Sequence, residues 1–122
     1  SVPNGIVPQF KEILFSKQQE IINDNASRNR DFFDTEMDKL DQWADDMKIS
    51  LEKEIKDLDA EIKLRKSEAK KMMNLEAKVK AQRLIKELEK KRSEKRQTLF
   101  FFLYEIDGRK DDLFIEIERR LN

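Results

Sequence analysis

The stretch Lys70–Lys80, KKMMNLEAKVK, interrupts two long helical patterns and decides the fold. Asn74 is a favourable N-cap residue, because its side-chain oxygen can accept a hydrogen bond from an unpaired backbone N–H of the next turn. Glu76 follows where the positive end of a new helix dipole favours a carboxylate. The pattern predicts that one helix ends and another begins near residue 74, so that the chain folds back as a hairpin. Met72 and Met73 are expected to pack within that turn rather than to form a patch for a partner.

The composition predicts an almost entirely helical chain. Of 122 residues only two are Gly and two are Pro, and both prolines precede residue 9, so little else in the sequence breaks a helix. Charged residues make up 43%, a proportion typical of coiled coils and long solvent-exposed helices rather than of a protein with a wide core. No apolar run approaches the roughly 20 residues of a membrane span, and no secretory signal is recognisable, so we expect a cytoplasmic location without membrane contact.

Two hydrophobic seams flank the expected turn. Their residues recur at steps that mostly alternate between four and three, the spacing of helices that pair as a coiled coil. A turn at Asn74 places Ile62 opposite Ile85, and Phe33 opposite Leu113. The first seam comprises Phe33, Met37, Leu40, Ala44, Met47, Leu51, Ile55, Leu58, Ile62, Arg65, Ala69 and Met72, and the second comprises Ala81, Ile85, Leu88, Arg92, Lys95, Leu99, Phe102, Ile106, Leu113, Ile117 and Leu121. We therefore expect an all-α fold, a long antiparallel coiled-coil helical hairpin with helices at residues 26–73 and 75–121.

A third, short helix is expected at residues 8–24. Its apolar residues recur at helical spacing, and the aromatic run at residues 100–104 surrounds the second long helix with more apolar groups than one seam can bury. We expect these parts to meet as a three-helix bundle at the base of a single domain. The polar run at residues 23–30 leaves open whether a turn separates the helices or one helix runs through. The expected docking core of the base is Phe10, Ile13, Leu14, Trp43, Phe100, Phe101, Phe102 and Phe114.

Two features of the second helix depart from its seam. Residues 89–98 contain no apolar side chain, so Lys and Arg stems are expected to cover Leu51 and Ile55 there, which predicts a loosely packed shaft. Gly108 stands inside the helix, where Gly is unfavourable relative to Ala, and marks either a kink or a close contact with the first helix.

Charge is the one functional signal in the residues themselves. Net charge is zero, but the segment 63–84 carries eight Lys and Arg against two Asp and Glu, whereas residues 1–50 and 97–122 are acidic in balance. The excess cations are either a solvated surface or a contact for DNA, RNA or an acidic partner through its backbone charge. The candidate contact residues are Lys63, Arg65, Lys66, Lys70, Lys71, Lys78, Lys80 and Arg83.

Four segments together resemble the C-terminal helical region of bacterial Swi/Snf-type helicase-like ATPases of the DEAD/DEAH-box superfamily. They are FFDTEMDKLDQWADDMK (32–48), LEKEIKDLDAEIK (51–63), LEAKVKAQRLIKELEKKR (75–92) and EIDGRKDDLFIEIERRL (105–121). The resemblance implies a fragment of a larger, ATP- and Mg-dependent nucleic-acid translocase, with the parent's own motor domains as partners. The family's Gly-rich phosphate loop and acidic Mg-binding box are missing from these residues.

No catalytic, cofactor-binding or metal-binding residue can be assigned. The chain has neither Cys nor His, and Asp45 and Asp46 form a surface pair on which nothing else converges. We therefore expect a non-catalytic coiled-coil accessory domain of a Swi/Snf-type helicase with a basic tip. The alternative is a purely structural or oligomerising coiled coil that uses residues 100–104 between copies. A monomer or weak homodimer is expected.

Overall fold

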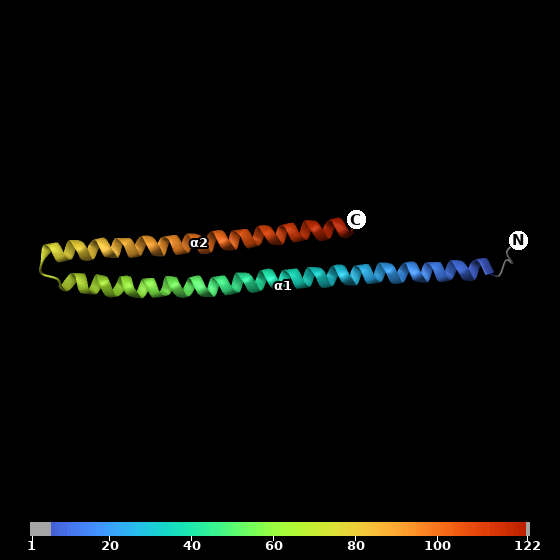
Figure 1. Cartoon of the computed structure of the whole chain (residues 1–122), viewed down its shortest axis with the longest axis horizontal. Coiled ribbons are helices and arrows are strands. Elements are labelled where there is room, and N and C mark those ends of the chain that lie inside the picture. The colour runs from blue at the N-terminus through green and yellow to red at the C-terminus, as the bar shows by residue number, and fades with distance from the viewer. Residues whose placement is uncertain (1–5, 122) are drawn as a thin grey trace. The chain divides into compact units, whose positions relative to one another are not determined.

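The computed structural model describes residues 6–121, which form two helices and contain no strand (Figure 1). Helix α1 spans Ile6–Lys71 and helix α2 spans Leu75–Leu121. The chain divides into two compact units, each built from both helices. One unit is Lys39–Asp111, and the other comprises the described residues of Ser1–Asp38 and Asp112–Asn122. The all-α prediction and the pairing of two helices are confirmed.

The turn between the helices lies where the sequence predicts it. The backbone N–H of Ala77 donates a hydrogen bond to Asn74 Oδ1 at 3.1 Å, and the N–H of Lys78 donates to the Asn74 carbonyl at 3.0 Å. Asn74 is therefore the N-cap of α2, with its side chain satisfying one of the unpaired donors of the first turn. At the other side of the turn, the Met72 N–H donates to the Ala69 carbonyl at 3.3 Å and tightens the end of α1.

In the unit Lys39–Asp111, the two helices pack along the predicted seams. Ile62, Ala69 and Ile85 form a buried cluster, against which Ala81 and Leu88 pack. Further along, Leu51, Leu58 and Ile106 are also buried, and Trp43 meets Phe102 edge to face with 5.0 Å between ring centroids. The alternation of four- and three-residue steps thus identified which side chains the two helices bury against each other. Arg65 is the exception, with a side chain that is 44% exposed.

The charged stretch of α2 is held by ion pairs across the seam. Arg92 Nη1 lies 2.7 Å from Asp59 Oδ1, and Lys95 Nζ lies 3.1 Å from Glu54 Oε2. Both cationic side chains are half-buried. Leu51, in the facing part of α1, is buried, with only 7% of its surface exposed. Aliphatic stems of Lys and Arg can cover apolar surface while their charged ends reach carboxylates at the rim. This arrangement accounts for a buried seam in a stretch without apolar residues.

In the second unit, α1 and α2 pack through aromatic side chains near the end of α2. Phe33 and Phe114 contact each other with ring centroids 6.1 Å apart, and Leu113 is buried. The guanidinium of Arg120 lies 4.2 Å above the Phe32 ring centroid, a cation–π contact. Leu121, which the sequence places in the seam, is 70% exposed.

Of the two alternatives that the sequence left open at residues 23–30, the structure shows the continuous helix, because α1 runs from Ile6 to Lys71. The separate helices expected at residues 8–24 and 26–73 are therefore parts of one helix. Residues 8–24 are the start of that helix and lie beyond the end of α2 (Figure 1). The residues of the run at 23–30 favour helix boundaries, but none is Pro or Gly, so nothing there forbids the helix from continuing. The structure does not confirm the three-helix bundle: Phe10, Ile13 and Leu14 are 59%, 57% and 47% exposed.

Gly108 is an ordinary helical residue on an open surface. It does not have a positive φ angle, and a Cβ atom built at this position would meet no atom within 4 Å. The alternative of a close contact with the first helix is therefore wrong. The backbone there does not require Gly.

Candidate functional site

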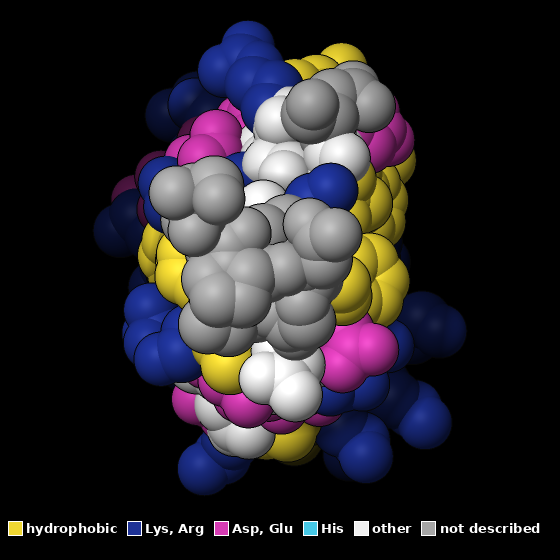
Figure 2. Space-filling model, turned by 90° about the vertical axis from the view of Figure 1, so that its right-hand side faces the viewer, with side chains coloured by type: hydrophobic (Ala, Val, Ile, Leu, Met, Phe, Trp, Pro, Cys, Tyr) yellow, Lys and Arg dark blue, Asp and Glu magenta, His cyan; other side chains and the backbone are white. Residues whose placement is uncertain are grey.

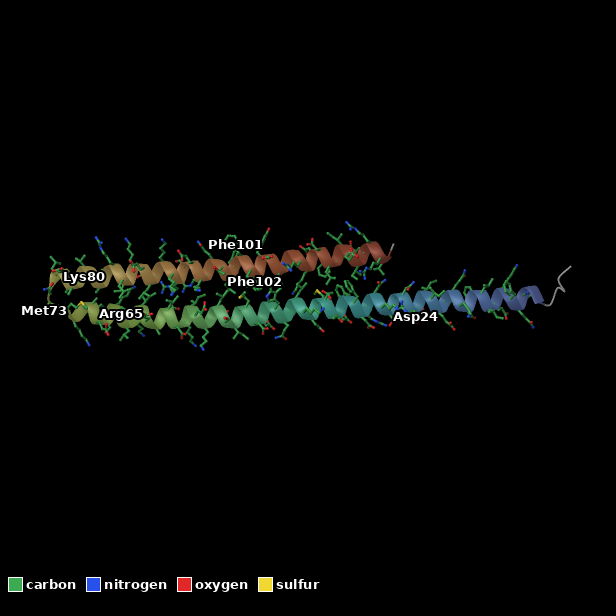
Figure 3. All side chains as sticks on the ribbon, in the orientation of Figure 1. Asp24, Arg65, Met73, Lys80, Phe101 and Phe102 are labelled. Carbon is green, nitrogen blue, oxygen red and sulfur yellow. The ribbon has the colours of Figure 1, made fainter. Side chains whose placement is uncertain are left out.

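The candidate site is the hairpin tip, the segment 63–84 that contains the end of α1, the turn and the start of α2. The eight predicted contact residues are all exposed on these two helix ends. Figure 3 shows Arg65 on α1 and Lys80 on α2, with Met73 at the turn between them. Lys70 and Lys71 occupy the last turn of α1, where the negative end of the helix dipole favours cations. The fold therefore brings together cations that the sequence places on both sides of the turn.

Three of the eight cations have carboxylate partners. Arg65 Nη2 lies 3.8 Å from Glu61 Oε1, and Arg65 Nη1 lies 3.9 Å from Glu68 Oε2. Across the seam, Lys66 Nζ lies 3.4 Å from Glu89 Oε1. Lys80 lies 3.8 Å from Glu76. Exposed pairs at these distances are weak and salt-sensitive, so they can exchange for another anion at little cost.

The other five tip cations are without an ion pair in the described part of the chain. They are Lys63, Lys70, Lys71, Lys78 and Arg83. Apart from the helix-dipole preference at Lys70 and Lys71, folding gives these charges no partner, since the described core contains no buried polar or charged residue. Because these positive charges lie close together, their combined potential makes the tip a surface that attracts anions.

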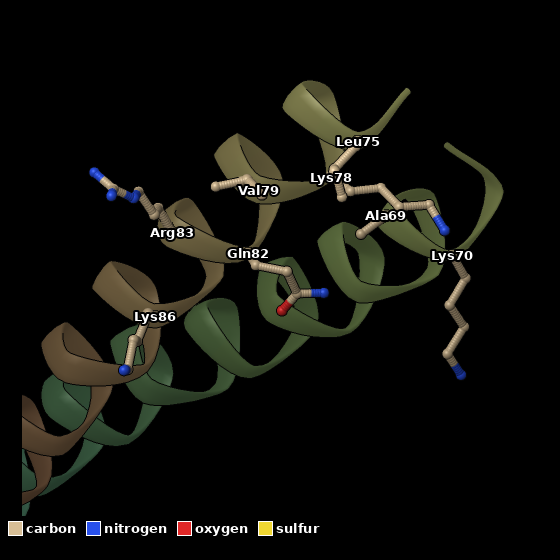
Figure 4. A pocket seen from close by; sticks show the side chains of 8 residues that line it. All are labelled: Ala69, Lys70, Leu75, Lys78, Val79, Gln82, Arg83 and Lys86. Carbon is tan, nitrogen blue, oxygen red and sulfur yellow. The ribbon is translucent and has the colours of Figure 1, made fainter. Parts of the chain in front are cut away.

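An apolar groove of about 500 Å³ runs along the tip beside these cations (Figure 4). It is open to solvent, and both helices contribute to it. Its lining consists of Ala69 and Lys70 from α1 and of Leu75, Lys78, Val79, Gln82, Arg83 and Lys86 from α2. Four of these eight residues are cationic and none is acidic. The groove thus combines an apolar floor with a positive rim.

A second, smaller groove of about 280 Å³ has a different chemistry. Arg65, Glu68, Met72, Ala77, Lys80, Ala81 and Leu84 line it. Here one carboxylate accompanies two cations, and Glu68 is within ion-pair distance of Arg65. The positive potential of this groove is therefore partly neutralised by its own residues, unlike that of the larger groove.

The tip exposes apolar side chains that sequence reasoning did not assign to a site. Met72 is half-buried, but Met73 is 98% exposed, so the expectation that both pack in the turn is wrong for Met73. Leu75 and Val79 are 77% and 48% exposed. Val79 follows Leu75 by four residues and Gln82 follows Val79 by three. This helical spacing was the available signal, because it forms a second stripe on α2 beside the buried seam.

The residues of the expected docking core do not form one buried cluster in the described structure. In the unit Lys39–Asp111, Phe102 is half-buried against Trp43, while Phe100 and Phe101 are 70% and 67% exposed. Figure 3 shows Phe101 on the side of α2 opposite to Phe102. A single helix cannot turn all of residues 100–104 toward one partner.

In the other unit, Phe114 packs on Phe33 but stays 40% exposed. Phe10, Ile13 and Leu14 are exposed, as are Phe15, Ile21 and Ile22 of the same segment. Figure 2 shows hydrophobic side chains reaching the surface beside charged ones on the face that it draws. This unit therefore offers apolar surface to a partner.

Among residues 6–121, no group of three or more Asp or Glu side chains is placed to hold a metal ion. Neither helix, over the residues described, includes a segment that is both apolar enough and long enough to cross a bilayer.

Comparisons with known protein families, curated proteins and solved structures found no match to the chain. Nothing in them links the chain to Swi/Snf-type ATPases, so that resemblance stays a prediction. The geometry and the charge of the tip are the features of this structure that bear on function.

Proposed function

We propose that this chain is a non-catalytic helical-hairpin module whose tip binds an anionic macromolecule. The observation that carries the proposal is the group of five tip cations without an ion pair, beside three others held only by weak exposed pairs. A cation that folding leaves unpaired keeps its full charge for a partner. The two helices serve as a support that holds this charge at one end of the unit Lys39–Asp111.

The resemblance to Swi/Snf-type helicases supplies a setting for this proposal. In that setting the module is a coiled-coil accessory domain, ATP and Mg act in the motor domains of its parent chain, and the anion is DNA or RNA. The segment 63–84 has no aromatic side chain on which a base could stack. Contacts would therefore be made to backbone phosphates and would not depend on base sequence. An acidic protein surface offers the tip the same charge.

The proposal is tested by anisotropy titrations with labelled duplex and single-stranded DNA and with polyglutamate, at several salt concentrations. Binding should weaken steeply with salt, because each neutralised charge releases counterions. A tip variant reverses five charges by changing Lys66, Lys70, Lys71, Lys78 and Lys80 to Glu. A control variant reverses five exposed shaft charges by changing Lys48, Lys53, Lys56, Lys90 and Lys91 to Glu.

The two variants have the same net charge, so they separate the tip from a general effect of charge. We expect the tip variant to lose binding to each anion and the control variant to retain most of it. Absence of binding to all three anions at low salt, or equal losses in the two variants, would show that the tip is only a solvated surface.

A second candidate function is self-association, favoured by the exposure of aromatic side chains on α2. Phe100, Phe101 and Tyr104 are 70%, 67% and 72% exposed. Apolar side chains gathered on a surface mark contact sites in many proteins. Sedimentation equilibrium of the wild type and of a variant with Phe100→Ser and Phe101→Ser tests this function. A dimer that dissociates in the variant would establish it, whereas a concentration-independent monomer would exclude it.

A further inference from the structure

We propose that the larger groove of the tip binds an acidic amphipathic helix of a partner protein. This inference rests on the proposed function, since it names the class of anion that the tip recognises. The groove supplies two features together, an apolar floor and a rim of cations, and each restricts the chemistry of what can occupy it.

The floor has the geometry of a helix-binding face. Leu75, Val79 and Gln82 of the floor follow one another at steps of four and three, and Lys86 of the rim comes four residues later, so all of them lie in one stripe along α2. Ala69 of α1, buried to 3% exposure, closes the groove on its other side (Figure 4). At 1.5 Å per residue the stripe extends for roughly 16 Å, the length of about three turns of a docked helix.

The exposed side chains of the floor explain why the occupant carries apolar residues. Leu75 and Val79 leave 77% and 48% of their surface in contact with water. They lie four residues apart, so apolar side chains at i, i+3 or i+4, and i+7 of a helix can pack against them, as in other helix-in-groove complexes. The docked helix would then complete a local three-helix arrangement, which buries more apolar surface than the hairpin does alone.

The rim explains why the occupant is acidic. Lys70, Lys78, Arg83 and Lys86 surround the floor, and none of them has an ion pair in the described structure. In Figure 4 the charged ends of Lys70 and Arg83 extend away from the floor. Asp or Glu residues flanking the apolar stripe of a docked helix would reach these cations. A basic helix would be repelled by these four cations.

Other occupants use only part of this surface. A phosphate backbone pairs with cations but leaves Leu75 and Val79 exposed, and the groove has no aromatic side chain for a base. An extended peptide needs partners for its backbone N–H and C=O groups, which the internally bonded α1 and α2 do not supply. A helix satisfies its own backbone, so it is the form of acidic chain that the groove accommodates best.

The test uses a synthetic peptide of 15 residues with Leu at positions 2, 6, 9 and 13 and mostly Glu elsewhere. Three probes are compared with it: a peptide of the same composition whose Leu residues do not form a stripe, polyglutamate of the same length, and duplex DNA. Binding to the full chain is measured by anisotropy. Amide chemical-shift changes in ¹⁵N-labelled protein identify the surface that is used.

The matched variants are Val79→Ser, on the floor of the larger groove, and Leu84→Ser, which lines the smaller groove and is 38% exposed. Circular dichroism of each variant verifies that the helices remain. We expect the striped peptide to bind more tightly than polyglutamate, with shift changes along residues 69–86. Val79→Ser should weaken its binding roughly tenfold, as loss of a buried apolar contact implies, and Leu84→Ser should change it little.

The possible failures are distinguishable. If no probe binds and the tip charges make no difference, the proposed function fails and this inference fails with it. If polyglutamate and DNA bind at the tip, but the striped peptide gains nothing over its scrambled form and Val79→Ser has no effect, the tip binds anions and only the helix-binding groove is refuted. Shift changes confined to another surface would also overturn the inference.

Discussion

Arg92 is the position at which replacing a charged residue should stabilise the protein. It stands in the α2 seam, where its side chain is 25% exposed, and its Nη1 lies 2.7 Å from Asp59 Oδ1. Its Nε atom, in contrast, is buried without a hydrogen-bond partner. The Arg92 guanidinium therefore has a partner for its Nη1 donor, whereas its Nε donor is buried away from water without one. Replacing it by Leu removes the unsatisfied donor and restores the apolar pattern of the seam.

The magnitude follows from two opposing effects. Leaving a buried donor unsatisfied costs about 1 to 3 kcal/mol. The pair with Asp59, which is 44% exposed, contributes about 0.2 to 1 kcal/mol, and Arg96 Nη2 remains 3.7 Å from the same carboxylate after the change. The aliphatic stem of Arg92 and the side chain of Leu cover similar apolar surface. Arg92→Leu should therefore raise the free energy of unfolding by about 1 kcal/mol, or the midpoint temperature by roughly 3 to 6 °C.

The measurement is a urea titration followed by circular dichroism and by fluorescence of Trp43, the one Trp in the chain. Trp43 packs on Phe102 in the same unit as Arg92, so its emission reports on that unit. Lys91→Leu is the matched control, because the adjacent exposed side chain loses the same charge without filling the seam. A lower free energy of unfolding for Arg92→Leu than for the wild type would refute the reasoning, since the ion pair would then outweigh the unsatisfied donor.

Three further changes test other local features. Gly108→Ala should raise the free energy of unfolding by up to about 1 kcal/mol in thermal melts, because the added Cβ meets no atom and Ala favours the helix. A lower midpoint temperature than that of the wild type would contradict this expectation. Asn74→Ala should lower the free energy of unfolding by roughly 1 kcal/mol, whereas Asn74→Asp should not, because Asp keeps an acceptor for the Ala77 N–H. Equal losses of stability in the two variants would argue against a capping role for Asn74. The hydrogen bond from Lys110 to Asp41, at 2.6 Å, raises the pKa of Lys110 above its ordinary 10.5. The stabilisation from this pair should be complete below pH 10.5 and disappear as the pH rises through the higher folded-state pKa of Lys110. Asp41→Asn should weaken this dependence in urea titrations, because it removes the largest of the interactions that raise this pKa.

The sequence predicted the hairpin because two local signals coincide. Asn74 and Glu76 mark the start of a helix, and the seams on either side have the spacing of paired helices. Each signal depends only on residues close together in the chain, so both survive in the structure. The burial of Ile62 with Ile85 follows once the position of the turn is known.

The third helix could not be predicted in the same way, because a hydrophobic pattern indicates that a face needs cover without indicating what provides it. Phe10 and Ile13 have helical spacing, and α1 is helical there, but no helix covers these side chains in the described structure. The polar run at 23–30 is compatible with a cap and with a continuous helix, and helix propagation favours the latter where no Pro or Gly intervenes. The groove escaped sequence reasoning for another reason: it needs Ala69 of α1 beside Val79 of α2, which only the packed hairpin brings together.

The tip is the part of the chain whose residues are least explained by folding. Seam positions are set by burial, and shaft charges such as Asp59 and Glu54 are matched by Arg92 and Lys95 across the helices. At the tip the same two helices leave cations without carboxylates, and they leave apolar side chains without a covering face. One missing element, a third helix that brings acidic and apolar residues together, would satisfy both deficits. Because the two deficits lie in the same groove, a single partner helix explains them more economically than separate anion and apolar ligands.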